Sequence, residues 1–347
     1  MNNRNHFLDY LKGFTITLVV LGHCIQYGAG SIMLEESLFY EHPIFKFIYS
    51  FHMPLFMMVS GYLFAFSINK GIGYNIKRRF SSLIVPVLSW SMLSFLFWSF
   101  SSILKGEPIS ILRLIKTPLT HLWFLWAVFW SSCIVLLIHK YFKDRILVYL
   151  LCILVSFFIP DDYNISMYKF VFPYFLMGYA WNKLGGAKKY TSNNVIYIVL
   201  FFIFGGLLLL FDRNSYIYIS GHCLLNDKIA LLPQLGIDLY RYLIGFVGSC
   251  FMMLTLYKLS NLINTRTLCF KPIVSILEYL GKNTLGIYII SVHLNVQLLA
   301  RICGQFSHLN FVWVLVETIL MIVICLMLIH LIQRYSILNR YFLGSQK

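Results

Sequence analysis

Long apolar runs separated by short polar segments recur along the whole chain. Runs of about 17–25 residues are long enough to cross the hydrocarbon core of a bilayer as helices. The fifth and sixth runs are the weakest, because one is short and the other carries Lys169 and Pro173, so a tilted or broken pair is an option there. The pattern predicts ten spans, at 8–27, 44–68, 83–103, 119–139, 146–160, 167–182, 194–211, 237–257, 281–302 and 311–333.

Composition agrees with this pattern. Of 347 residues, 59% are hydrophobic and 12% charged, whereas soluble domains are about half apolar and about a quarter charged. An ordinary soluble enzyme is therefore excluded, and we expect an all-α, polytopic membrane protein. The expected organisation is a single integral-membrane domain over 1–347, with no appended soluble domain and no cleaved signal peptide.

The net charge of +15 comes from Lys and Arg dispersed over short loops. Because no continuous basic stripe forms, a nucleic-acid partner is not expected. Most basic residues fall at one side if the N-terminus is inside, and most acids fall in the opposite loops, so both termini are expected in the cytoplasm. The eight Cys show no CxxC pair and are interpreted as packing residues, with Cys223 and Cys303 as an optional outer pair.

Ionisable side chains inside the predicted spans are the functional signal, because charge in hydrocarbon is costly. Asp9, Lys12 and His23 share one face of the first helix, and Lys12 and His23 lie roughly 16 Å apart along its axis. Asp9 and Lys12, three residues apart, are placed to form an ion pair. That pair is either a structural contact at the membrane boundary or part of a site that includes His23.

Two further imidazoles, His52 and His293, are predicted at a depth close to that of His23. One interpretation is a general base with supporting hydrogen-bond partners, since His titrates near neutrality. The alternative is that each His bonds a nearby backbone carbonyl. No carboxylate or His-x3-His spacing accompanies the three, so no metal is expected.

Two further features have both a structural and a functional interpretation, and a third is interpreted as structural. The loop Lys77-Arg78-Arg79 is either positive-inside bias or an anchor for donor phosphates. Trp123 and its neighbours are either an aromatic belt or a sugar-stacking platform. Arg301 and Glu317 are placed to pair across helices, which would be structural.

Several stretches, in order along the chain, resemble the acyltransferase family 3 membrane proteins, and within them the fucose 4-O-acetylase-like branch. Each stretch alone is weakly specific, but together they cover nearly the whole chain. They are Phe7–Gly13, Val19–His23, Phe51–Phe56, Ser60–Tyr62, His121–Leu125 and Leu280–Tyr288.

The resemblance implies a ten-helix enzyme of a bacterial plasma (inner) membrane that moves an acyl group, usually acetyl, from cytosolic acetyl-CoA. The acceptor would be a hydroxyl of a surface or exported polysaccharide, or of a lipid-linked sugar. The family pattern of Arg or Lys, ten residues, then His falls on Lys12 and His23, with His23 as the base. A second pattern of two Arg fits Arg79 but meets Ser82 at its second position, and Ser291 occupies the place of a family His two residues before His293.

These lines converge on named roles. His23 is the expected catalytic base or transient acyl carrier, supported by His52, Lys12 and Asp9. Lys77, Arg78 and Arg79 are the expected donor-phosphate ligands, and Trp123, Tyr288 and His293 the acceptor-binding residues. The alternatives are a transporter or flippase for a sugar-lipid or anion, and a polymerase acting through the outer loop 212–236.

Overall fold

A computed structural model describes residues 6–28, 38–120, 122–185, 194–225, 229–266, 271–294 and 311–345. Within these residues all regular structure is helical, which confirms the all-α prediction. The longer helices are α1 (His6–Gly28), α4 (Pro43–Ala65), α5 (Ile72–Arg79), α6 (Val85–Leu104), α7 (Ile111–Thr120), α8 (Trp123–Phe142), α9 (Ile146–Ser156), α10 (Ile165–Lys183), α11 (Asn194–Leu209), α13 (Leu231–Arg266), α14 (Lys271–Lys282), α15 (Thr284–Leu294), α17 (Phe311–Gln333) and α18 (Ser336–Leu343). The short turns α3 (Leu38–Glu41) and α12 (Ile217–Ser220) complete the set.

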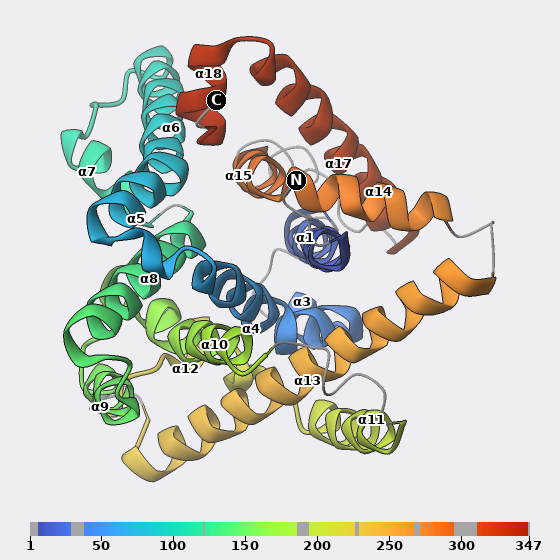
Figure 1. The fold of residues 1–347 in the computed structure, drawn as a ribbon. Coiled ribbons are helices and arrows are strands. Elements are labelled where there is room, and N and C mark those ends of the chain that lie inside the picture. Colours follow the sequence, from blue (N-terminus) through green and yellow to red (C-terminus); the bar gives the residue numbers. More distant parts are fainter. Residues whose placement is uncertain are drawn as a thin grey trace.

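Helix α1 lies inside the bundle, seen nearly end-on in Figure 1 with α4, α14, α15 and α17 around it. In α1 and in α4, two-thirds of the residues of the most apolar segment are buried inside the protein, whereas in α17 only one-third are. The helix that carries the expected base is therefore enclosed by protein, while α9 and α11 lie at the periphery (Figure 1). That arrangement fits polar side chains on α1, because they face protein rather than lipid.

Close backbone contact fixes α1 against α14. A Cβ at Gly13 would lie 1.7 Å from the carbonyl oxygen of Leu277, and one at Gly281 would lie 1.8 Å from that of Asp9. Only glycine permits this approach, as in other tightly packed membrane helices. The contact holds the first turns of α1, and with them Asp9 and Lys12, in a set position.

The described part of the chain has six helices long and apolar enough to cross a membrane, or seven if α14 and α15 form one bent span. The protein is thus a polytopic membrane protein, while the count of ten and the side of the termini remain predictions. α9 and α11 are shorter than expected, with 11 and 16 residues. α10 runs unbroken through Lys169 and Pro173, and the buried side chain of Lys169 pairs with Asp161 at 2.6 Å.

Two predicted boundaries are wrong. The predicted start of the span 281–302 falls in the last two residues of α14, which ends at Lys282; α15 begins at Thr284 after a bend of 77°. The predicted loop Lys77-Arg78-Arg79 is helical, since α5 continues through a π-helical turn at Phe80–Ile84 into α6. His121, Arg301 and Cys303 lie outside the described residues, so the pairings of Arg301 with Glu317 and of Cys223 with Cys303 stay predictions.

Candidate active site

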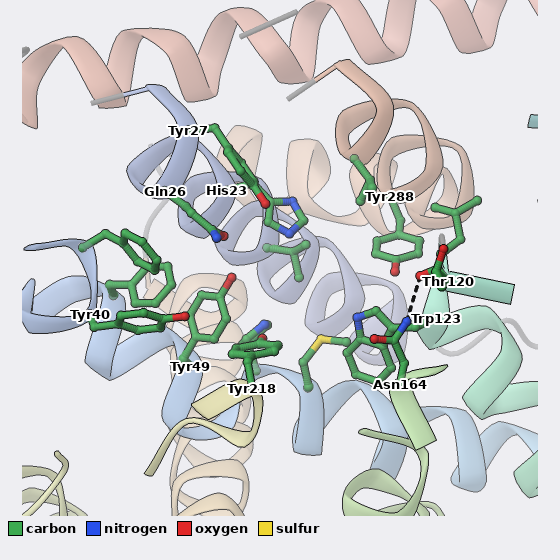
Figure 2. Close-up of a pocket in the computed structure, with 17 residues that line it drawn as sticks. His23, Gln26, Tyr27, Tyr40, Tyr49, Thr120, Trp123, Asn164, Tyr218 and Tyr288 are labelled. Atoms are coloured by element: carbon green, nitrogen blue, oxygen red, sulfur yellow. Dashed lines mark hydrogen bonds between the residues drawn. The ribbon is translucent and has the colours of Figure 1, made fainter. Parts of the chain in front are cut away.

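A cavity of about 480 Å³ lies beside the C-terminal half of α1 (Figure 2). We call it the His23 cavity. Its walls come from α1, α4 and α15 and from the segments around 120–123, 164 and 218. Aromatic rings dominate the lining, which includes Tyr27, Tyr40, Tyr49, Tyr218, Tyr288 and Trp123. A mixture of ring faces with hydroxyl, amide and imidazole groups is the type of surface that orients a small polar ligand.

His23 is half-buried at this cavity. Its Nδ1 atom is buried and makes no hydrogen bond to any described residue. The ring of Tyr27, one turn further along α1, lies 6.3 Å from the imidazole, measured between centroids. Buried polar atoms are nearly always hydrogen-bonded, so an unpartnered imidazole nitrogen at a cavity makes His23 a candidate for contact with a ligand.

His52 lines the same cavity from α4. Its Nδ1 donates a hydrogen bond to the Ile48 carbonyl oxygen at 2.7 Å, and its ring meets that of Tyr49 edge-on with centroids 4.7 Å apart. With its proton on Nδ1, the neutral ring keeps Nε2 as an acceptor. Both interpretations of the sequence thus apply to His52, which bonds a backbone carbonyl and also stands at the site.

A second cavity of about 320 Å³, the Lys12 cavity, adjoins the first along α1. Its walls are mostly apolar, from residues such as Phe56, Val128 and Leu285. Lys12 Nζ lies 2.8 Å from Asp9 Oδ1, which confirms the predicted ion pair. Val19, Met53 and Tyr288 line both cavities, so these side chains form the junction between them.

The other predicted site residues divide between the cavities and the surrounding protein. Trp123 and Tyr288 line the His23 cavity. His293 does not, because Val292 takes the cavity-facing position on α15. Because successive residues of a helix point about 100° apart, His293, which follows Val292, points away from the cavity. His293 Nδ1 donates to the Ile289 carbonyl oxygen at 2.8 Å, and its ring centroid lies 5.1 Å from that of Trp90.

The basic residues of α5 do not line the Lys12 cavity. Lys77 and Arg78 are exposed, and Arg78 donates to the Tyr74 hydroxyl at 3.0 Å. Arg79 is half-buried, with its guanidinium 4.4 Å from the centre of the Phe64 ring. Leu83, one turn beyond Arg79, does line the cavity, so α5 leads directly to the cavity wall.

Sequence reasoning missed several cavity residues. Tyr27 follows His23 by four residues and Tyr49 precedes His52 by three, so helical spacing alone was a sufficient signal for both. Tyr218 and Asn164 come from short connecting segments, for which the sequence offers no such spacing.

Comparison with known proteins identifies relatives but no solved structure that matches. The chain is 31% identical over 186 residues to Nodulation protein NolL of Mesorhizobium japonicum, covering 52% of this chain and 48% of that protein. It is 32% identical over 189 residues to Nodulation protein NolL of Sinorhizobium fredii, covering 52% and 49%. No solved structure matches.

The chain therefore spans about half the length of the curated relatives it matches. The model of the acyltransferase domain family, in contrast, matches residues 5–330, which contain every residue of both cavities. On that match the chain belongs to the acyltransferase domain family.

Proposed function

We propose that the chain transfers an acetyl group from acetyl-CoA to a hydroxyl of a bacterial surface or exported polysaccharide, or of a lipid-linked sugar. The observation that carries the proposal is the pair of adjoining cavities that meet at Val19, Met53 and Tyr288. One has mostly apolar walls and two lysines, Lys12 and Lys282, and the other has aromatic and polar walls with His23. Each half suits one of two chemically different substrates.

The Lys12 cavity suits the donor. A cavity with mostly apolar walls suits the pantetheine arm, and Leu83 in its wall follows directly on the basic helix α5. In the proposal, Lys77, Arg78 and Arg79 hold the phosphates of CoA at the cytoplasmic face, because Lys and Arg are the usual phosphate ligands. Lys12, positioned by Asp9, supplies a further positive charge inside the channel.

The His23 cavity suits the acceptor, which would enter from the side opposite to CoA. His23 accepts the proton of the sugar hydroxyl while the sugar oxygen attacks the thioester carbonyl carbon. A C–O bond forms, the C–S bond breaks, and the proton passes from the imidazolium to the leaving CoA sulfur. In the alternative mechanism, His23 first takes the acetyl group onto a ring nitrogen with release of CoA, and the sugar hydroxyl attacks this acetyl group in a second step.

Other residues of the cavity position the reactants. The bond of His52 Nδ1 to the Ile48 carbonyl leaves Nε2 as the acceptor of the neutral ring, and in the proposal Nε2 accepts a hydrogen bond from the acceptor sugar. Trp123 and Tyr288 present ring faces to the sugar. We place the protein in the plasma membrane, where cytosolic acetyl-CoA and exported glycan are on opposite sides.

The test measures ester-linked acetate on surface glycan by proton NMR, in host cells lacking the protein and complemented with wild type, His23→Ala or His293→Gln. Membrane levels of the three proteins are matched by immunoblot. We expect wild type and His293→Gln to restore acetate and His23→Ala to leave it absent. Restoration by His23→Ala would place the base elsewhere, and no acetate difference for wild type would overturn the acetyl assignment.

A further inference from the structure

A third cavity, of about 640 Å³, adjoins the His23 cavity on the side away from Lys12. We call it the vestibule. It is lined by residues 160–167, which join α9 to α10, and by residues 217–225, which contain α12. Asn164 and Tyr218 line both the vestibule and the His23 cavity, so a ligand longer than the His23 cavity would extend past them.

The chemistry of the vestibule is that of a carbohydrate site. Its polar side chains are two carboxylates, an amide and two hydroxyls, from Asp161, Asp162, Asn164, Ser166 and Ser220. These groups both donate and accept hydrogen bonds, as the hydroxyls of a sugar do. Tyr218 adds an aromatic ring and is 42% exposed. Amphipathic rings of this kind suit a ligand with both apolar and polar faces.

The vestibule is held in shape by a buried polar network. Arg241 on α13 donates to the carbonyl oxygens of Ser215 at 3.0 Å and Gly221 at 2.9 Å. The backbone N–H of His222 donates to Asp161 Oδ2 at 2.6 Å. The wall of residues 217–225 is thereby tied to α13, and the wall of residues 160–167 is tied to it through Asp161. Preorganised walls reduce the cost of ordering a bound ligand.

The charge of the vestibule selects among sugars. Among the described residues that line it there is no Lys or Arg. Asp161 is compensated from behind by Lys169, whose Nζ lies 2.6 Å from Oδ1 and whose side chain is 4% exposed. Asp162 is exposed at the cavity. A carboxylate on the ligand would be repelled by the carboxylate of Asp162, because like charges in a confined site are unfavourable.

We propose that the vestibule is a subsite for the second sugar unit of the acceptor, and that this unit is uncharged. The inference rests on the proposed function. It adds that the substrate is a neutral oligosaccharide or polysaccharide segment and that a single sugar occupies only half of the acceptor site.

The experiment uses membranes containing the full chain, acetyl-CoA labelled in the acetyl group, and de-O-acetylated fragments of the host glycan sorted by length. We expect kcat/KM to rise about tenfold from one sugar unit to two. Oxidising the second unit to a uronic acid should remove that gain. Equal kcat/KM for one and two units would overturn the subsite, and an undiminished gain with the uronic acid would overturn its charge selectivity.

Two variants test whether the rise in kcat/KM with the second sugar unit comes from the vestibule. Asp162→Ala removes an exposed group, and Ser166→Leu narrows the cavity from the first turn of α10. Both should lower kcat/KM for the two-unit acceptor several-fold and leave the one-unit value unchanged, while Glu107→Gln, an exposed acid outside the cavity, changes neither. Equal loss for both lengths in Asp162→Ala and Ser166→Leu would contradict the proposal. Absence of label in every acceptor, intact glycan included, would overturn the proposed function as well.

Discussion

The two cavities along α1 differ in what they offer a ligand, although they share three residues. Around Lys12 the walls are mostly apolar, and the ion pair of Lys12 with Asp9 is internal to the helix. Around His23 the walls are aromatic and polar, and a buried imidazole nitrogen has no partner among the described residues. One helix can thus contribute to two different binding sites, because Lys12 and His23, eleven residues apart, share a face of α1 but line different cavities.

The largest expected effect is on the chemistry of the His23 cavity. His23→Gln keeps size and polarity but removes the base, so the rate of labelled acetyl transfer in membranes should fall by about 10²–10⁴-fold. The KM for acetyl-CoA should stay unchanged, because the donor is assigned to the other cavity. His293→Gln, on the α15 face that points away from the cavity, is the matched control. Activity retained in His23→Gln would remove the catalytic assignment.

A smaller effect is expected at the junction. Val19→Phe, at a buried position that faces both cavities, should lower kcat at least tenfold by obstructing the meeting of the substrates. Binding of labelled CoA to purified protein in detergent should persist, because the Lys12 end remains open. Loss of CoA binding together with activity would instead indicate that the helices have repacked.

Substitutions in the Lys12 cavity should change the affinity for the donor, acetyl-CoA. Lys12→Met removes one of the two lysines that line the cavity, so we expect the KM for acetyl-CoA to rise about tenfold, since a charged hydrogen bond contributes about 1.5–3 kcal/mol. The KM for the acceptor should not change. Lys12→Arg preserves the charge and should recover most of the affinity. A shift in acceptor KM would contradict the division of roles between the cavities.

The smallest effect on activity is expected at a polar cluster remote from both cavities. Burial raises the pKa of the Asp144 carboxyl, but hydrogen bonds from Lys183, His139 and Tyr149 outweigh that effect and lower the pKa to about 2. A carboxyl whose pKa is lowered by folding stabilises the folded state above its unfolded pKa and loses that stabilisation as pH falls through the folded value.

Asp144→Asn should therefore lower the Tm in detergent at neutral pH, and the difference from wild type should shrink as pH falls from about 4 to about 2. Asn tolerates the left-handed backbone that Asp144 adopts, with φ of 56°, so the substitution tests charge instead of conformation. Acetyl transfer at neutral pH should be unaffected. A Tm difference independent of pH would show that the carboxylate charge is not what stabilises this turn.

The parts that the sequence predicts best are local. The ion pair of Asp9 with Lys12 follows from a three-residue spacing on one helix, and the face shared with His23 follows from helical period. The bend after Lys282 and the helical state of Arg79 were not predicted, because both depend on packing against other helices. His293 shows the limit of sequence reasoning most clearly. Its depth in the membrane follows from counting residues, but whether His293 or the neighbouring Val292 faces the cavity depends on how α15 packs.

The meeting of the cavities at Val19, Met53 and Tyr288 has a consequence for the cell apart from catalysis. In the proposed orientation, water reaches this point from both sides of the membrane, and the membrane stores energy as an ion gradient. Two apolar side chains and one aromatic ring then form the barrier to proton and ion leakage, since an apolar constriction excludes water. Trimming these residues to admit bulkier acyl groups would therefore be expected to increase permeability.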